Sequence, residues 1–139
     1  MISDSISSAI LTIGIKASIP IATEIQEVVR NLRTNLGVDV SLLDAWDGVH
    51  APDGCFRSDG WELIPKFVGD TNCLMFLPGA SEFWRFRNGN DLHAVLRECP
   101  AFEFYVCDEN ASYLLCSNHH DFVIGWGTAL PWVRGLASN

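Results

Sequence analysis

Apolar residues near the N-terminus recur at the spacing of an amphipathic helix. Over residues 3–14 the pattern i, i+3, i+4, i+7 predicts a first helix, although Leu11, Ile13 and Ile15 also alternate as in a strand. Residues 20–37 repeat the pattern more fully and predict a second helix, which Gly37 can close. We expect a capping box formed by Thr23 and Gln26 at its start. The charged side chains of this second segment would then form its solvent-facing side.

Five later runs of apolar residues have the length and the alternation of β-strands. Residues 72–79 ("NCLMFLPG") and 81–89 ("SEFWRFRNG") predict a hairpin joined through Pro78 and Gly79. Residues 101–127 contain three further runs, separated by short polar stretches at the spacing of a meander. The first of these runs should alternate between faces, with Phe102, Phe104 and Val106 on one side and Glu103, Tyr105 and Cys107 on the other.

The remaining segments complete one α+β domain spanning residues 1–139. Residues 91–99 ("DLHAVLREC") predict a helix capped by Asn90, and the tail from Leu130 predicts a last short helix. Trp61–Phe67 fits either a short helix or a strand. We therefore expect an antiparallel sheet of about five strands with helices packed on it, in the order α-α-β-β-α-β-β-β-α.

The composition is that of a folded domain with an excess of negative charge. Apolar residues make up 48% of the chain, which is enough for one hydrophobic core. The 17 acidic residues outnumber the 9 basic ones and give a formal net charge of −8. Such a field repels the phosphates of nucleic acids and attracts basic proteins. We therefore expect a protein partner and no nucleic acid.

No segment predicts a membrane span, and the cysteines predict reduced thiols. An uncharged run such as Ser5–Ile15 is about half as long as the ~20 apolar residues that a span requires. The five cysteines are odd in number and contain no C-x-x-C pair, so neither a disulfide framework nor a zinc knuckle is indicated. We expect a cytoplasmic protein with no cofactor and no membrane partner, and a homodimer is the alternative assembly.

Residues 44–60 form the longest predicted loop, which combines carboxylates with aromatic side chains. Exposed aromatic side chains surrounded by carboxylates suit an interface with a basic protein. The candidate partner-binding residues are Asp44, Trp46, Asp47, Asp53, Asp59 and Trp61. The other interpretation of this segment is a solvated connection without a binding role.

Residues 116–121 bring groups that can bind a metal or attack a substrate into one short stretch. The alternative function is therefore a small metal-dependent or cysteine-dependent enzyme. Its centre would comprise Cys116, His119, His120 and Asp121. His93 and His50 would be the more distant candidates for a metal ligand.

The same stretch can also be a polar turn between two strands, and this is the interpretation that we favour. Adjacent side chains on a strand point to opposite faces, so we expect His119 and His120 to be split between them. Asn118 and Asp121 would then cap backbone N–H groups. On this interpretation the chain has no metal site and no catalytic residue.

Two further features of the strands suggest structural roles. Glu103 lies between two phenylalanines, so we expect it to be half-buried and paired with Arg85 or Arg87. Gly125 and Gly127 belong to no phosphate-binding motif, and close packing of the backbone is the simpler reason for them.

Residues 98–127, "ECPAFEFYVCDENASYLLCSNHHDFVIGWG", carry a motif. This segment resembles a small family of uncharacterised bacterial domains marked by E-C-P-x-F-E-[FY]-Y-V and, further on, by L-L-C-x-N-H-H. The chain also has a looser likeness, in pattern only, to the acidic SUKH-type immunity domains. These are single α+β units with a helix before a twisted antiparallel sheet.

The resemblance implies a bacterial or phage-related protein that is encoded beside a toxin. An acidic protein of this size then fits a non-enzymatic immunity protein that binds and neutralises a basic toxin.

Overall fold

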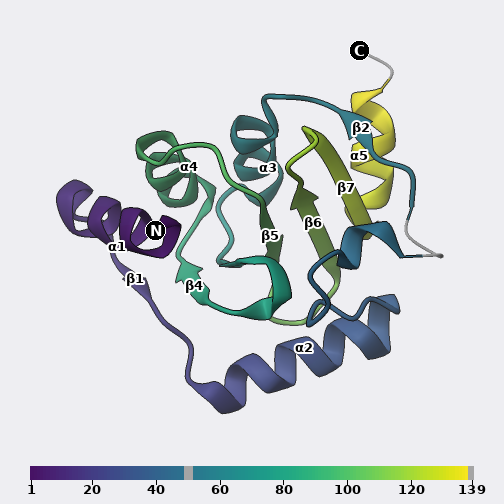
Figure 1. The fold of residues 1–139 in the computed structure, drawn as a ribbon, viewed down its shortest axis with the longest axis horizontal. Coiled ribbons are helices and arrows are strands. Elements are labelled where there is room, and N and C mark those ends of the chain that lie inside the picture. The colour runs from purple at the N-terminus through teal and green to yellow at the C-terminus, as the bar shows by residue number, and fades with distance from the viewer. Residues whose placement is uncertain (49–51, 138–139) are drawn as a thin grey trace.

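The structure is a computed structural model that describes residues 1–48 and 52–137. This part of the chain is a single α+β domain with five helices and one antiparallel sheet (Figure 1). The helices are α1 (Ile2–Ile13), α2 (Ala22–Leu36), α3 (Gly60–Val68), α4 (Gly89–Glu98) and α5 (Leu130–Leu136). The strands are β1 (Ala17–Ser18), β2 (Cys55–Phe56), β3 (Cys73–Phe76), β4 (Phe83–Phe86), β5 (Phe104–Cys107), β6 (Tyr113–Ser117) and β7 (Phe122–Gly127). Two short 3₁₀ turns, η1 (Ala45–Asp47) and η2 (Pro78–Ala80), lie in the connections.

The sheet is open and its strand order is β1-β4-β3-β5-β6-β7-β2. The α+β class, the β3–β4 hairpin and the β5–β6–β7 meander are confirmed. The predicted element order is wrong in three places, because it lacks the edge strands β1 and β2 and the helix α3. Each edge strand is only two residues long, so no alternation of apolar and polar residues can reveal it.

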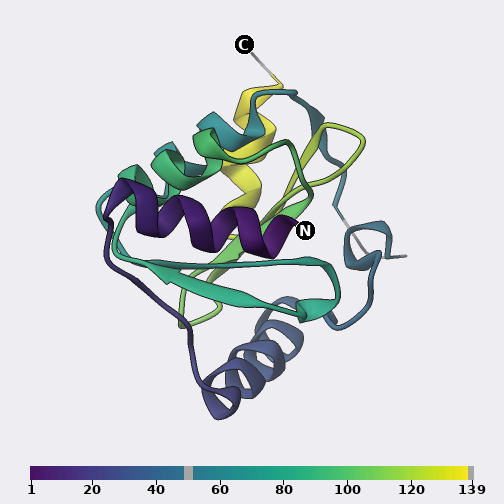
Figure 2. The same cartoon turned by 60° about the vertical axis from the view of Figure 1, so that its left-hand side comes forward.

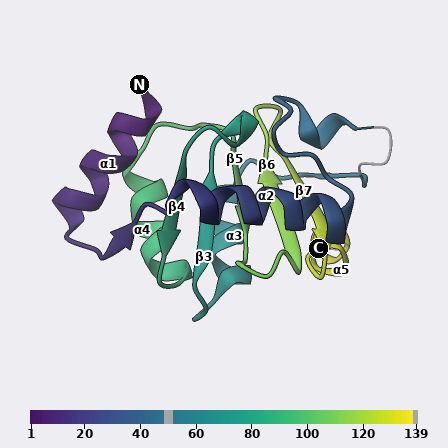
Figure 3. The same cartoon turned by 90° about the horizontal axis from the view of Figure 1, so that it is seen from below.

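Helices cover both faces of the sheet, but unequally. On one face, here called the four-helix face, α1, α3, α4 and α5 share a buried cluster with the sheet. On the other, here called the α2 face, α2 and the connection that follows it are what covers the strands within the described residues. Figure 2 shows α2 on the opposite side of the sheet from the other helices, and Figure 3 shows it crossing the strands.

The side chains of β5 alternate between these two faces as predicted. Phe104 and Val106 are buried on the four-helix face, whereas Tyr105 and Cys107 are buried on the α2 face. Because both faces are covered, the central strands are apolar on both sides, and every residue of β3 and β5 is buried.

Two helix caps differ from the prediction. The capping box of α2 lies two residues before the predicted one, because Ile21 is the N-cap and Glu24 accepts a hydrogen bond from its backbone N–H at 3.0 Å. The helix α4 is capped by Asn88 and not by Asn90, since Asn88 Oδ1 accepts from the Asp91 N–H at 2.8 Å. The earlier start is possible because Gly89 has no Cβ, which would overlap the carbonyl of Pro65.

Close packing explains both glycines of β7. A Cβ on Gly125 would lie 2.7 Å from Val133 Cγ2 of α5. Gly127 has φ +66° and contacts the Ser112 carbonyl, so a side chain there would be strained and would clash. The interpretation of these glycines as packing residues is therefore confirmed.

None of the described helices has the length and apolar content needed to cross a lipid bilayer.

Candidate functional site

The connection between α2 and β2 is fixed to the sheet by a tryptophan. Trp46, in η1, donates a hydrogen bond from its indole Nε1 to Glu103 Oε2 over 3.2 Å. Three neighbouring apolar side chains of the connection, Val38, Val40 and Ala45, are buried in the α2-face cluster. The described part of this connection, residues 38–48, is therefore an ordered segment of the surface and not a freely moving loop.

Glu103 also fixes the turn between β6 and β7. Its Oε1 accepts a hydrogen bond from the His119 backbone N–H at 3.0 Å and lies 2.7 Å from His119 Nδ1. The Glu103 side chain is only 10% exposed, so its carboxylate needs these partners.

The predicted pairing of Glu103 with Arg85 or Arg87 is wrong. Arg85 binds Glu24 and Glu109, and Arg87 binds Asp91. The reason is the strand order, because β3 lies between β4, which carries Arg85, and β5, which Glu103 precedes.

Asn118 shapes the β6–β7 turn as predicted. Its buried Oδ1 accepts hydrogen bonds from the backbone N–H groups of His120 and Phe122, each at 3.0 Å. Asp121 acts differently from the prediction, because it takes part through its backbone. It adopts φ +62°, and its carbonyl accepts from the Arg57 N–H at 2.8 Å.

The prediction that the two histidines lie on opposite faces is wrong. The rings of His119 and His120 have centroids 4.0 Å apart, and both contact the edge or face of Trp46, at 5.6 and 5.8 Å. The physical reason is that β6 ends at Ser117, so the histidines belong to the turn and do not follow the alternation of a strand.

An exposed aromatic residue continues this surface. Phe56 of β2 is 65% exposed and packs edge-on against Phe122 of β7, with ring centroids 5.6 Å apart. One run of contacts therefore lies at the β2 edge of the α2 face. It comprises Trp46, the β6–β7 turn, Phe122 and Phe56.

Three exposed carboxylates lie in the two segments that carry Trp46 and the histidines. Asp44 and Asp47 are close to Trp46 in the chain and Asp121 follows His120, and none of the three forms an ion pair with any residue in the described ranges. We call these three carboxylates, together with Leu42, Leu43, Trp46, Phe56, His119, His120 and Phe122, the acidic end.

The structure brings together only part of the predicted partner-binding set. Asp44, Trp46 and Asp47 belong to the acidic end, whereas Asp53 lies beside α5, where it lines a pocket with Val133 and Arg134. Asp59 is instead neutralised by Arg57, whose Nε and Nη2 lie 3.0 and 2.9 Å from its two carboxylate oxygens. These hydrogen bonds also lower the pKa of Asp59.

Trp61 lies on the four-helix face, where it and Asp121 line one cavity, and it makes none of the ring contacts of Trp46. It stacks on His93 of α4 with ring centroids 5.3 Å apart and an angle of 16° between the planes. His93 is therefore packed against an indole. His50, the other distant ligand candidate, lies outside the described residues.

Two exposed leucines of the acidic end were not among the predicted site residues. Leu42 and Leu43 are 58% and 70% exposed, directly before Asp44. The signal in the sequence was a pair of large apolar residues directly before Asp44, where the predicted loop begins. Exposed apolar side chains next to carboxylates are typical of a binding surface.

The geometry does not support Cys116 as a nucleophile. Cys116 is completely buried on the α2 face, and this burial, together with the charge of Glu103, raises the pKa of its thiol well above the ordinary value. A reactive thiol needs the opposite shift. Within the described ranges, no three His, Cys, Asp or Glu side chains are arranged to hold a metal ion.

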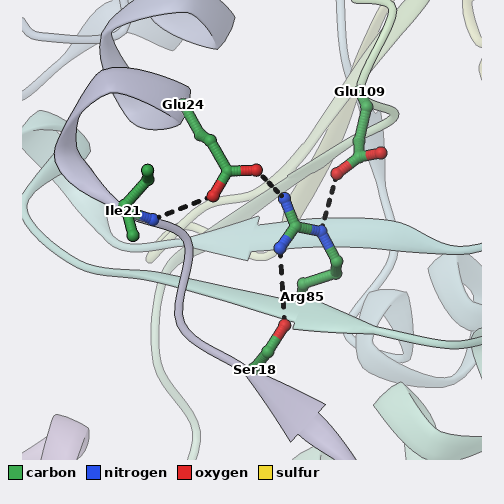
Figure 4. A network of polar contacts seen from close by, with 5 residues as sticks. All are labelled: Ser18, Ile21, Glu24, Arg85 and Glu109. Carbon is green, nitrogen blue, oxygen red and sulfur yellow. Dashed lines mark hydrogen bonds and ion pairs between the residues drawn. The ribbon is translucent and has the colours of Figure 1, made fainter.

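A second polar network, on the same face, holds α2 in place (Figure 4). Arg85 of β4 binds Glu24 at 3.0 Å and Glu109 at 2.6 Å, and its Nη1 lies 3.4 Å from Ser18 Oγ. It therefore links α2, the β5–β6 connection and β1. The Ile21 N–H and then Arg85 lower the pKa of Glu24, so this carboxylate stays ionised.

Comparison with known proteins gives no match to a family model, to a curated protein or to a solved structure.

Proposed function

We propose that this chain is a non-enzymatic binding module for a basic protein, and that the acidic end is its binding surface. Within this class, we propose an immunity protein that neutralises a basic toxin, as the resemblance of residues 98–127 implies. Opposite charges would speed the encounter, and the apolar side chains would hold the complex.

One observation carries the proposal: unpaired carboxylates and exposed apolar side chains occur together at the acidic end. The three carboxylates Asp44, Asp47 and Asp121 have no lysine or arginine as an ion-pair partner among the described residues. Leu42, Leu43 and Phe56 supply apolar area beside them. A solvated connection has no need of three exposed large apolar side chains, whereas an interface does.

The order of this surface adds further support. The Glu103 carboxylate accepts hydrogen bonds both from Trp46 and from the backbone of the β6–β7 turn. Two separate segments of the acidic end are therefore fixed by one buried carboxylate. A surface that is already ordered loses less conformational entropy when it binds a partner.

The first experiment tests for the partner. The chain is purified together with the product of the neighbouring gene, and the growth of cells that express the gene product alone is compared with that of cells that express both. We expect a complex that co-elutes in gel filtration and restores growth. Separate elution, or growth that is not restored, would contradict the proposal.

The second experiment tests the surface with matched variants. Leu42→Ser with Leu43→Ser removes exposed apolar side chains from the acidic end. Leu11→Ser removes one from α1, where Leu11 is 82% exposed. All three positions are solvent-exposed, so these changes should leave folding intact. We expect the double variant to weaken the complex at least roughly tenfold and Leu11→Ser to leave it unchanged. Equal effects at both places would place the interface elsewhere.

A further inference from the structure

A small cavity opens on the four-helix face, away from the contacts of Trp46. It has a volume of about 150 Å³ and lies where α3, the C-terminal end of α4 and the ends of β5 and β6 meet. Its apolar walls include Trp61, Leu96, Phe102 and Phe104. This volume is below the range of about 300–1,000 Å³ in which drug-sized ligands bind, so only a small molecule fits.

The walls of the cavity are held by ring contacts. Trp61 stacks on His93, and Phe102 packs against Phe104 with centroids 5.4 Å apart. At the N-terminus of α3, Gly60 lies so close to the sheet that a Cβ would be 2.8 Å from Val123 Cγ2. These contacts hold the walls that α3 and the start of β5 provide, and Pro100 and Ala101 of the α4–β5 connection complete the lining.

Polar side chains without partners line the same cavity. Its lining includes Arg97, Asp121, Ser58 and Ser117. None of these four side chains has a hydrogen bond or an ion pair to another residue of the described chain. Arg97 and Asp121 are exposed, so they lie at the rim.

The two opposite charges at the rim do not meet. Arg97 projects from α4, whereas Asp121 is fixed in the β6–β7 turn with φ +62°. No ion pair within 4.0 Å joins them, although both border one cavity. A ligand with an ammonium group and a carboxylate could bind both side chains at once.

We propose that this cavity binds a small zwitterion, a free α-amino acid with a short apolar side chain. The ligand's carboxylate binds Arg97, its ammonium group binds Asp121, and its side chain packs between Trp61, Leu96 and Phe102. The hydroxyl groups of Ser58 and Ser117 provide further hydrogen bonds. This site adjoins the proposed partner interface and shares Asp121 with it.

The test is a titration of the isotope-labelled protein with L-valine, followed through the NMR signals of the Trp61 indole and of Arg97. We expect saturable shifts with a Kd of about 1 mM or lower. L-Valinamide lacks the carboxylate and 3-methylbutanoate lacks the amine, so each should bind at least roughly tenfold more weakly. No saturable shift with L-valine, or equal binding of all three compounds, would overturn the proposal.

Variants separate the cavity from the rest of the surface. Arg97→Gln should raise the Kd for L-valine roughly tenfold or more, whereas Arg30→Gln, which changes another unpaired exposed arginine on α2, should not. Asp121→Asn should weaken binding similarly, and asparagine tolerates the positive φ at this position. Arg97 is not part of the acidic end, so its result is independent of partner binding. Unchanged binding by Arg97→Gln would contradict the proposed contacts.

Discussion

The two faces of the sheet are covered in different ways. On the four-helix face, four helices pack against the strands and against one another, and the interactions are mainly apolar. On the α2 face, one helix and residues 38–48 cover the strands, and polar contacts fix each of them: Arg85 holds α2, and Glu103 holds the connection. The first face stabilises the fold, and the second exposes charged and aromatic groups beside a smaller apolar cluster.

This difference indicates where stability and recognition lie in the molecule. Apolar packing is lost only when the structure opens, whereas exposed carboxylates and rings at the edge of a thin layer are accessible without any rearrangement. The acidic end is part of the thinly covered face, and this is why we place the partner there.

The largest expected effect on stability comes from shortening a buried leucine on either face of the sheet. Leu92 of α4 and Leu32 of α2 are both completely buried. Each change to alanine should lower the free energy of unfolding by about 2–5 kcal/mol. Leu92→Ala should be near the upper limit, because neighbouring helices prevent α4 from closing the cavity, whereas α2 can shift toward the sheet. Urea denaturation of both variants measures this, and a larger loss for Leu32→Ala would contradict the comparison.

The next effect concerns the polar attachment of α2. Arg85→Met removes three side-chain contacts and should lower the free energy of unfolding by roughly 1 kcal/mol, because these partly exposed ion pairs are screened by solvent. Arg87→Met, which removes a single ion pair from an adjacent and more exposed position, should have a smaller effect. Thermal unfolding at low and high salt measures both. Equal effects of the two variants would show that Arg85 does not hold α2.

A local effect is expected when the hydrogen bond that attaches residues 38–48 to the sheet is removed. Trp46→Phe keeps a ring against the histidines but removes the N–H that Glu103 accepts. Backbone amides of residues 38–48 should then exchange with solvent faster, while global stability changes by about 1 kcal/mol or less. Trp61→Phe, on the other face, is the control and should leave these amides unchanged. Hydrogen exchange followed by mass spectrometry measures this, and an unchanged rate in Trp46→Phe would refute the attachment.

The smallest effect is a pH dependence at the start of α2. The pKa of Glu24 is lowered in the folded chain below its usual value of 4.5, first by the Ile21 N–H and then by Arg85. The stabilisation that this carboxylate provides is therefore complete above pH 4.5 and is lost as the pH falls through the lowered value. The difference in stability between the wild type and Glu24→Gln should shrink in that range. A difference that stays constant down to the acid transition would contradict this.

The sequence was sufficient for features that depend on local pattern. The central strands and α2 follow from the alternation and periodicity of their own residues, and Asn118 follows from its place at a turn. The edge strands β1 and β2 could not be predicted, because a two-residue pairing is decided by the neighbouring strand and leaves no pattern.

The candidate site was predicted less well, because it depends on long-range contacts. The partner of Glu103 follows from the strand order, which places β3 between β4 and β5. The arrangement of the histidines depends on where β6 ends, and a shift of one or two residues decides between strand and turn. The carboxylates near Trp46 were identified, but Asp59 has a counter-ion two residues away, and this pairing became evident only in the structure.

The most direct test of the acidic end compares two variants with the same net charge. One changes Asp44, Asp47 and Asp121 to asparagine, and the other changes the exposed residues Glu27, Glu62 and Glu98 to glutamine. The rate constant for association with the co-eluting partner is measured at increasing salt. We predict at least a roughly tenfold slower association for the first variant, with a weaker salt dependence, and a much smaller change for the second. Equal rate constants for the two variants would contradict the account.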